Sequence, residues 1–160
     1  MIDYYVPTDE TLLASFGRVA IAHGHLERSL KMTVKTLGGA SVREALDQQL
    51  RKGPASVRKR IEKLARAKLG QHVAVEQLLS LLKRAEDASE QRHGWVHGVW
   101  ATDVNTAQAM IVTEDHEWIP IPSAEELNRV ASELEGLAKE LNKVRLHGSL
   151  SAALTEVRPT

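Results

Sequence analysis

Arginine and histidine side chains gather near the middle of the chain, where residues 92–98 are Arg-His-Gly-Trp-Val-His-Gly. Arginine presents a fixed cationic fork that fits phosphate oxygens. Histidine has an unperturbed pKa of about 6.5, so it can move a proton near neutral pH. Arg92 with His97 therefore suits metal-free cleavage of RNA. One group would act on the 2′-hydroxyl or the leaving oxygen, and the other would stabilise the charged phosphorus centre.

This spacing is not specific by itself, because Arg18 and His23 repeat it. Five residues along an ideal helix turn the side chain by about 140° around the axis. An arginine and a histidine so placed meet at one phosphate only if the helix lies in a cleft or unwinds, for example at Gly94 and Gly98. Arg18 is expected in mid-helix on the outer side, next to His25, so context favours the later pair.

Apolar residues recur every three or four positions over most of the chain, which predicts amphipathic helices. Ser41 with Glu44, and Ser123 with Glu126, have the capping-box spacing that marks a helix start. The expected helices cover roughly residues 10–37, 41–50, 55–69, 71–98 and 123–144.

A shorter alternation follows the third long helix, over Val99–Asp103 and Ala109–Thr113, and predicts a small β-hairpin. The sequence therefore predicts an all-α fold, a four-to-five-helix bundle with a small β-hairpin between its last two long helices. Residues 1–147 are expected to form a single helical domain. Residues 148–160 are expected to be a C-terminal tail with at most a short turn.

The third long helix changes its chemistry in its last two turns. Leu81 and Leu82 begin two seams of inward positions, and following these seams three or four residues at a time reaches Arg92, His93 and His97. Polar groups thus replace apolar ones on the side that faces the bundle. A helix that served only for packing would not place them there.

These residues resemble the signature of the HEPN family, which is an arginine, a polar residue, three variable residues and a histidine near the end of a late helix. Here the pattern is Arg92, His93, three residues and His97. Gly98 and the extended segment after it are similar to many stand-alone members. Residues 24–30, Gly-His-Leu-Glu-Arg-Ser-Leu, resemble the Leu-Glu-x-x-Leu pattern of the family's first helix.

The resemblance covers roughly residues 10–147 and implies a metal-independent endoribonuclease that cleaves RNA by 2′-hydroxyl attack. It implies that Arg92 and His97 are catalytic and that His93 orients the pair or the RNA. It further implies a homodimer whose two motifs share one cleft, a role as a toxin or defence effector, and an antitoxin protein as a candidate partner. Val99 departs from the tyrosine common in toxins that are paired with nucleotidyltransferases. The alternative is a non-catalytic HEPN-like RNA- or protein-binding scaffold.

Glu27 and Glu86 are the expected supporting residues. Glu27 follows a row of small residues on the first helix, formed by Gly17, Ala20 and Gly24. Another helix is expected to approach closely along this row. Because a lone buried charge is costly, Glu27 is expected to orient Arg92 or His97. In the alternative interpretation, Arg92 is a structural arginine that is paired with Glu27 or Glu86.

A metal site is a further alternative for the two late histidines. His93 and His97 are four residues apart, a spacing that suits a metal ion, and Glu86 or His23 could be brought near them. No third ligand is obvious, so the sequence predicts neither a metal nor a cofactor. His23, which lies inside an apolar stripe, is expected to be a hydrogen-bonded core residue.

The formal net charge of zero hides a strong asymmetry. Residues 51–68 hold eight Lys and Arg against one acid, whereas residues 114–140 hold eight acids against two basic residues. A basic helix could guide an RNA backbone through counterion release, and otherwise it is a solvated face. The candidate RNA-binding residues on it are Arg58, Lys59, Lys63 and Arg66.

The composition narrows the classes of protein to consider. The chain has no cysteine, which excludes disulfides, thiolate metal sites and thiol nucleophiles. No apolar run approaches the ~18–20 residues that span a bilayer, and the N-terminus lacks a signal pattern. We therefore expect a cytoplasmic protein that has no membrane contact.

Overall fold

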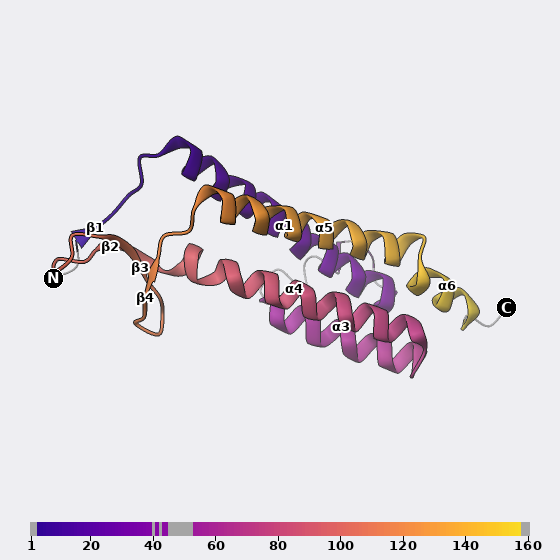
Figure 1. The fold of residues 1–160 in the computed structure, drawn as a ribbon. Helices are drawn as coiled ribbons and strands as arrows, with labels where there is room; N and C mark the ends of the chain where they lie inside the picture. Colours follow the sequence, from indigo (N-terminus) through magenta and orange to yellow (C-terminus); the bar gives the residue numbers. More distant parts are fainter. Residues whose placement is uncertain (1–2, 40, 42, 45–52, 158–160) are drawn as a thin grey trace.

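The computed structural model describes residues 3–39, 41, 43–44 and 53–157 of the 160-residue chain (Figure 1). The described part is mostly helical, with one small antiparallel sheet. In chain order the elements are β1 (Asp3–Tyr4), α1 (Glu10–Gly38), α3 (Pro54–Leu69), α4 (Val73–His97), β2 (Val99–Thr102), β3 (Ala109–Val112), β4 (Trp118–Pro120), α5 (Ala124–Leu146) and α6 (Ser149–Glu156).

The helices begin and end where the capping residues predict. The Asp9 side chain accepts hydrogen bonds from the backbone N–H groups of the first turn of α1. Gly39 ends that helix with φ of 69°, a left-handed conformation that glycine adopts at little cost. Ser123 and Glu126 form the expected capping box of α5. The helix expected over residues 41–50 lies mostly outside the described residues.

The long helices form two pairs that lie side by side (Figure 1). α1 and α5 run parallel, since later residues of α1 contact later residues of α5. Arg18 donates to Asn128 at one end of the pair, and Asn142 donates to Ser29 further along. α3 and α4 form an antiparallel hairpin that turns at Gly70. Leucine dominates the core between the pairs, and Leu26, Leu30, Leu78, Leu134 and Leu137 are buried there.

The predicted two-stranded hairpin is part of a larger sheet with strand order β1-β2-β3-β4. β1 comes from the N-terminus and pairs with β2, and β4 extends the other edge. The expected fold class was therefore too simple in this region. The reason is that pairing between Tyr4 and Ala101 is non-local, and local periodicity carries no trace of it. Pro120 fits as the last residue of an edge strand.

The C-terminal segment contributes to the core. Residues expected to be a tail with a short turn form α6, in which Leu150 and Ala153 are fully buried. Within the described residues, no helix combines the length and the apolar character needed to cross a lipid bilayer.

Gly98, between α4 and β2, is expected to tolerate no side chain. A β-carbon there would collide with the Ile111 side chain and would lie 2.5 Å from the carbonyl oxygen of Gly94. Gly98→Ala should lower the free energy of unfolding by about 2 kcal/mol, as overpacking does. Gly17→Ala in α1, where nothing lies within 4 Å, should instead raise it by about 0.5–1 kcal/mol. Urea denaturation measures both, and equal effects would contradict the packing described.

Candidate functional site

An open cavity of about 680 Å³ lies between α1, α3 and the last turns of α4. The residues that line it are Ala20, His23, Gly24, Glu27, Pro54, Ala55, Arg58, Glu86, Ser89, Glu90, Arg92, His93 and His97. Of the sequence-predicted site residues, all three catalytic candidates and both supporting glutamates border this one space.

Small residues on α1 make room for the cavity. Ala20 and Gly24 lie on its wall, and a β-carbon built on Gly24 would meet nothing within 4 Å. The expectation that another helix packs closely along this row is therefore wrong for the described residues. The short side chains leave space, and polar side chains from the last turns of α4 border that space.

Arg92 is half-buried at the wall of this cavity. Its Nε is buried and has no hydrogen-bond partner. Among the described residues its guanidinium forms no ion pair. Burial lowers the pKa of Arg92, and the carboxylate of Glu27 opposes this shift from a distance. A desolvated cation without a bound counter-charge is a group that gains from an anionic ligand.

Glu86 is engaged by a different arginine. Arg58 on α3 donates from Nη2 to Glu86 Oε1 at 3.0 Å, and this contact lowers the pKa of Glu86. Lys83 lies 3.5 Å from the other oxygen of the same carboxylate. The buried Nη1 of Arg58 has no partner. Glu86 therefore positions Arg58 rather than Arg92, and two guanidiniums with unpartnered nitrogens border one cavity.

His23 is buried, at 7% exposed, as expected for a core residue, and it also lines the cavity. Burial and then the charge of Arg92 lower its pKa, and Glu27, whose carboxylate is 3.9 Å away, opposes them. The signal available in the sequence was the spacing between His23 and Glu27, which sets them one turn apart on α1.

The other two histidines lie at the end of α4 and are exposed. The ring centroids of His93 and His97 are 4.6 Å apart. His93 Nε2 also lies 3.9 Å from the carboxylate of Glu114, in the turn between β3 and β4. Both imidazoles are therefore open to solvent and also border the cavity.

The four basic residues proposed for RNA binding do not form one cluster. Arg58 lines the cavity, and Lys59 borders a neighbouring groove of about 320 Å³ on α3 and α4. Arg66 is paired with Glu62 at 3.0 Å. Lys63 is exposed on α3. The site thus has a basic flank on α3, but only its first residue reaches the cavity.

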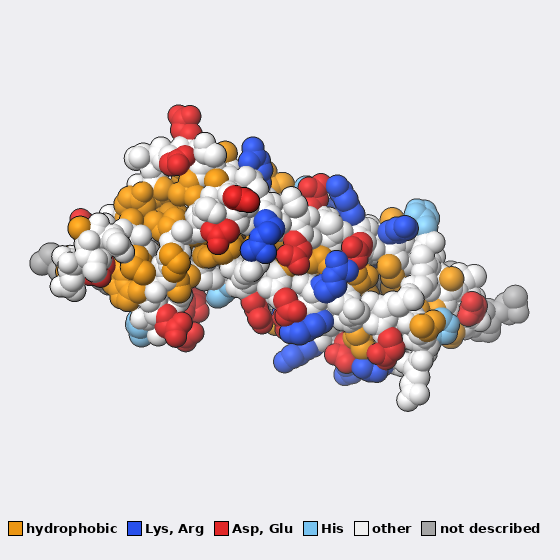
Figure 2. Space-filling view, viewed as in Figure 1, with side chains coloured by type: hydrophobic (Ala, Val, Ile, Leu, Met, Phe, Trp, Pro, Cys, Tyr) orange, Lys and Arg blue, Asp and Glu red, His pale blue; other side chains and the backbone are white. Residues whose placement is uncertain are grey.

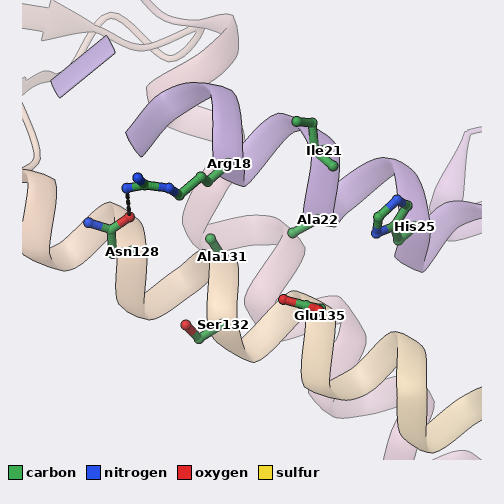
Figure 3. Close-up of a pocket in the computed structure, with 8 residues that line it drawn as sticks. All are labelled: Arg18, Ile21, Ala22, His25, Asn128, Ala131, Ser132 and Glu135. Carbon is green, nitrogen blue, oxygen red and sulfur yellow. Dashed lines mark hydrogen bonds between the residues drawn. The ribbon is translucent and has the colours of Figure 1, made fainter. Parts of the chain in front are cut away.

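The second arginine–histidine pair with the same spacing is split by α1. His23 faces the candidate site, whereas Arg18 lies on the opposite side, in a groove of about 480 Å³ between α1 and α5 (Figure 3). There Arg18 donates to Asn128 at 3.0 Å, and His25 lies further along the same groove. Arg18 is thus exposed and shares one groove with His25, as predicted, but this side of α1 faces α5.

A metal site gains no support from the side-chain positions. In the part of the chain that the structure describes, no three His, Asp or Glu residues are arranged so that they could hold an ion.

The chain was compared with protein-family models, curated proteins and solved structures, and none of them matches it. Function is accordingly inferred from the residues of the cavity.

Acidic pH is expected to destabilise the protein partly through His23. Because its folded pKa is below the unfolded value, the unfolded state takes up the proton first as pH falls below about 6.5. Stability is therefore full above that pH and is lost below it. In His23→Gln the loss of thermal stability between about pH 7.5 and pH 5.5 should be smaller. His25→Gln, on the opposite side of α1, should behave as wild type. Equal pH dependence in all three proteins would refute this assignment.

Proposed function

We propose that this protein is a metal-independent endoribonuclease of the HEPN type, which acts as a toxin or defence effector. The observation that carries the proposal is the unpaired, partly desolvated guanidinium of Arg92 on the wall of a cavity that His97 also borders. An arginine in that state favours a ligand with negative oxygens. An imidazole at the same cavity supplies the proton transfer that phosphodiester cleavage needs.

The proposed reaction uses the substrate's own nucleophile. The ribose 2′-hydroxyl attacks the adjacent phosphorus, the bond to the 5′-oxygen breaks, and a 2′,3′-cyclic phosphate and a 5′-hydroxyl are formed. Arg92 stabilises the extra negative charge on the phosphoryl oxygens. His97 transfers a proton to or from the reacting oxygens, and His93, whose ring lies against that of His97, orients it or the RNA.

RNA is the proposed substrate because the cavity has a basic flank and because the proposed reaction uses a ribose 2′-hydroxyl as nucleophile. Arg58 would contact a phosphate next to the reacting one, since its unpartnered Nη1 borders the same space as Arg92. Lys59 and Lys63 on the same helix would attract the backbone from solvent. A homodimer that brings two such cavities together, and an antitoxin that blocks them, belong to the same proposal.

A non-catalytic RNA-binding scaffold is the second candidate. The observation that favours it is the pair of unpartnered arginine nitrogens, because Arg58 and Arg92 could hold phosphates without any proton transfer. The two candidates differ in what happens to RNA after it binds.

Purified protein should cut single-stranded RNA in the presence of EDTA and leave cyclic phosphate ends. His97→Ala should lower the cleavage rate by about 100-fold or more, the range for loss of a general acid or base. RNA binding by that variant should change little. His25→Ala, on the far side of α1, is the matched control and should cleave normally. Full activity in His97→Ala would remove the enzyme assignment, and binding without cleavage in wild type would favour the scaffold.

Arg58 is expected to matter more for RNA affinity than its neighbours on α3. Arg58→Gln should weaken binding by about tenfold, since it removes a cavity cation, whereas Lys63→Gln should change it by about twofold. Arg84→Gln removes a surface arginine that is paired with Glu140, and it should have no effect. Fluorescence anisotropy with labelled RNA at two salt concentrations measures these differences. A larger effect of Lys63 than of Arg58 would place the RNA path elsewhere.

A further inference from the structure

The small sheet has an apolar face that is turned away from the helices and is partly exposed. Residues directly opposite one another in an antiparallel sheet point to the same side. Trp100, Ile111 and Ile119 are opposite one another and face the helices, where Trp100 contacts Phe16 of α1 and Ile119 lies close to Gly94 of α4.

The alternate positions form the other side, which we term the outer sheet face: Tyr4, Val99, Ala101, Met110, Val112, Trp118 and Pro120. Ala101, in its middle, is fully buried, and Met110 and Val112 are half-buried. Tyr4 is 79% exposed, Val99 43% and Trp118 41%. All seven side chains are apolar or aromatic, and they come from four strands. Exposed apolar side chains gathered on one face mark an interaction site more often than singly scattered ones do.

Charge is distributed very unevenly around this face. Residues 1–17 and 93–128 contain nine Asp and Glu and no Lys or Arg, so all 21 basic residues lie elsewhere. The carboxylates stand in the turns that frame the strands, at Asp103, Glu114 and Glu117 among others. In Figure 2 the hydrophobic surface at the sheet end has acidic side chains on several sides, and Lys and Arg approach it only where the helices adjoin it.

The apolar face and its acidic border together indicate which kind of partner fits this surface. RNA and anionic lipid are repelled by a rim of carboxylates without a compensating cation. A second copy docked face to face would bring two acidic rims together, which like charges oppose. A protein surface with an apolar centre and a border of Lys and Arg fits the apolar character of the face and the negative charge of its border.

We infer that the outer sheet face is a docking site for a protein partner that presents apolar side chains framed by lysine and arginine. The inference is independent of RNA cleavage. The site also has a physical link to the cavity, because Glu114 in the rim lies 3.9 Å from His93 and Val99 follows His97 by two residues. A partner seated there would stand beside the imidazoles.

Two synthetic peptides of equal length test this inference. One alternates valine or phenylalanine with lysine, and the other has glutamate in place of every lysine. Fluorescence anisotropy measures the binding of each to the full chain at low and at physiological salt. The lysine peptide should bind at least about tenfold more tightly than the glutamate peptide, and added salt should weaken it.

Variants locate the binding. Trp118→Ser should weaken binding of the lysine peptide by about tenfold. The double variant Glu114→Gln with Glu117→Gln, which leaves the sheet packing untouched, should weaken the same binding by about threefold or more. Ile21→Ser with Glu133→Gln removes an exposed apolar residue and an acid from the helices, and it should bind as wild type. Circular dichroism checks that each variant is folded.

Three results would overturn the inference. The first is equal binding of the lysine and glutamate peptides, or no binding of either. The second is binding of the lysine peptide that neither face nor rim substitutions weaken. The third is concentration-dependent dimerisation of the wild type, seen by sedimentation and lost in Trp118→Ser, which would show that a second copy occupies the face.

Discussion

The candidate site depends on a positive charge that the fold leaves without a bound counter-charge. Three carboxylates line the cavity, those of Glu27, Glu86 and Glu90, and none of them pairs with Arg92 in the described residues. Glu86 is engaged by Arg58 and Lys83, and Glu27 acts on Arg92 only through space. Burial makes the isolated guanidinium less stable, so the free energy gained on meeting an anion is larger than at an open surface.

The packing of α1 decides where that cavity can form. One side of the helix lies against α5, where the polar contact of Arg18 and that of Ser29 hold the two helices in parallel register. On another side, Ala20 and Gly24 have too little volume to fill the space toward α4. His23 and Glu27 lie on this second side as well, so a residue of the apolar stripe also becomes part of the cavity wall.

We infer that the cavity and the sheet end favour ligands of opposite charge. The cavity has a cationic flank from α3, whereas the sheet end has acids and no Lys or Arg. An anionic polymer is drawn to the first and repelled by the second, while a basic protein has the opposite preference. The last turn of α4 and the strand after it join these regions, so His93 stands between Arg92 and the acidic turn at Glu114. A formal net charge of zero gives no hint of this separation.

The sequence by itself determined the helices, their caps and the small number of groups able to do phosphate chemistry. Apolar periodicity and capping are local properties, so the limits of α1 and α5 and the capping box at Ser123 could be predicted closely. It also indicated that Arg92, His93 and His97 belong to one region of α4, because helix geometry fixes which positions share a face, and all three border the cavity, although both histidines are exposed.

Only the tertiary structure decided which side chains meet. The pairing of Glu86 with Arg58 rather than Arg92, and the placement of His23 on the cavity wall, depend on how α1, α3 and α4 pack. The strand at Tyr4 likewise forms by pairing with a segment almost a hundred residues away. Such contacts are set by the packing of whole helices and strands, and the spacing of residues along one segment does not encode them.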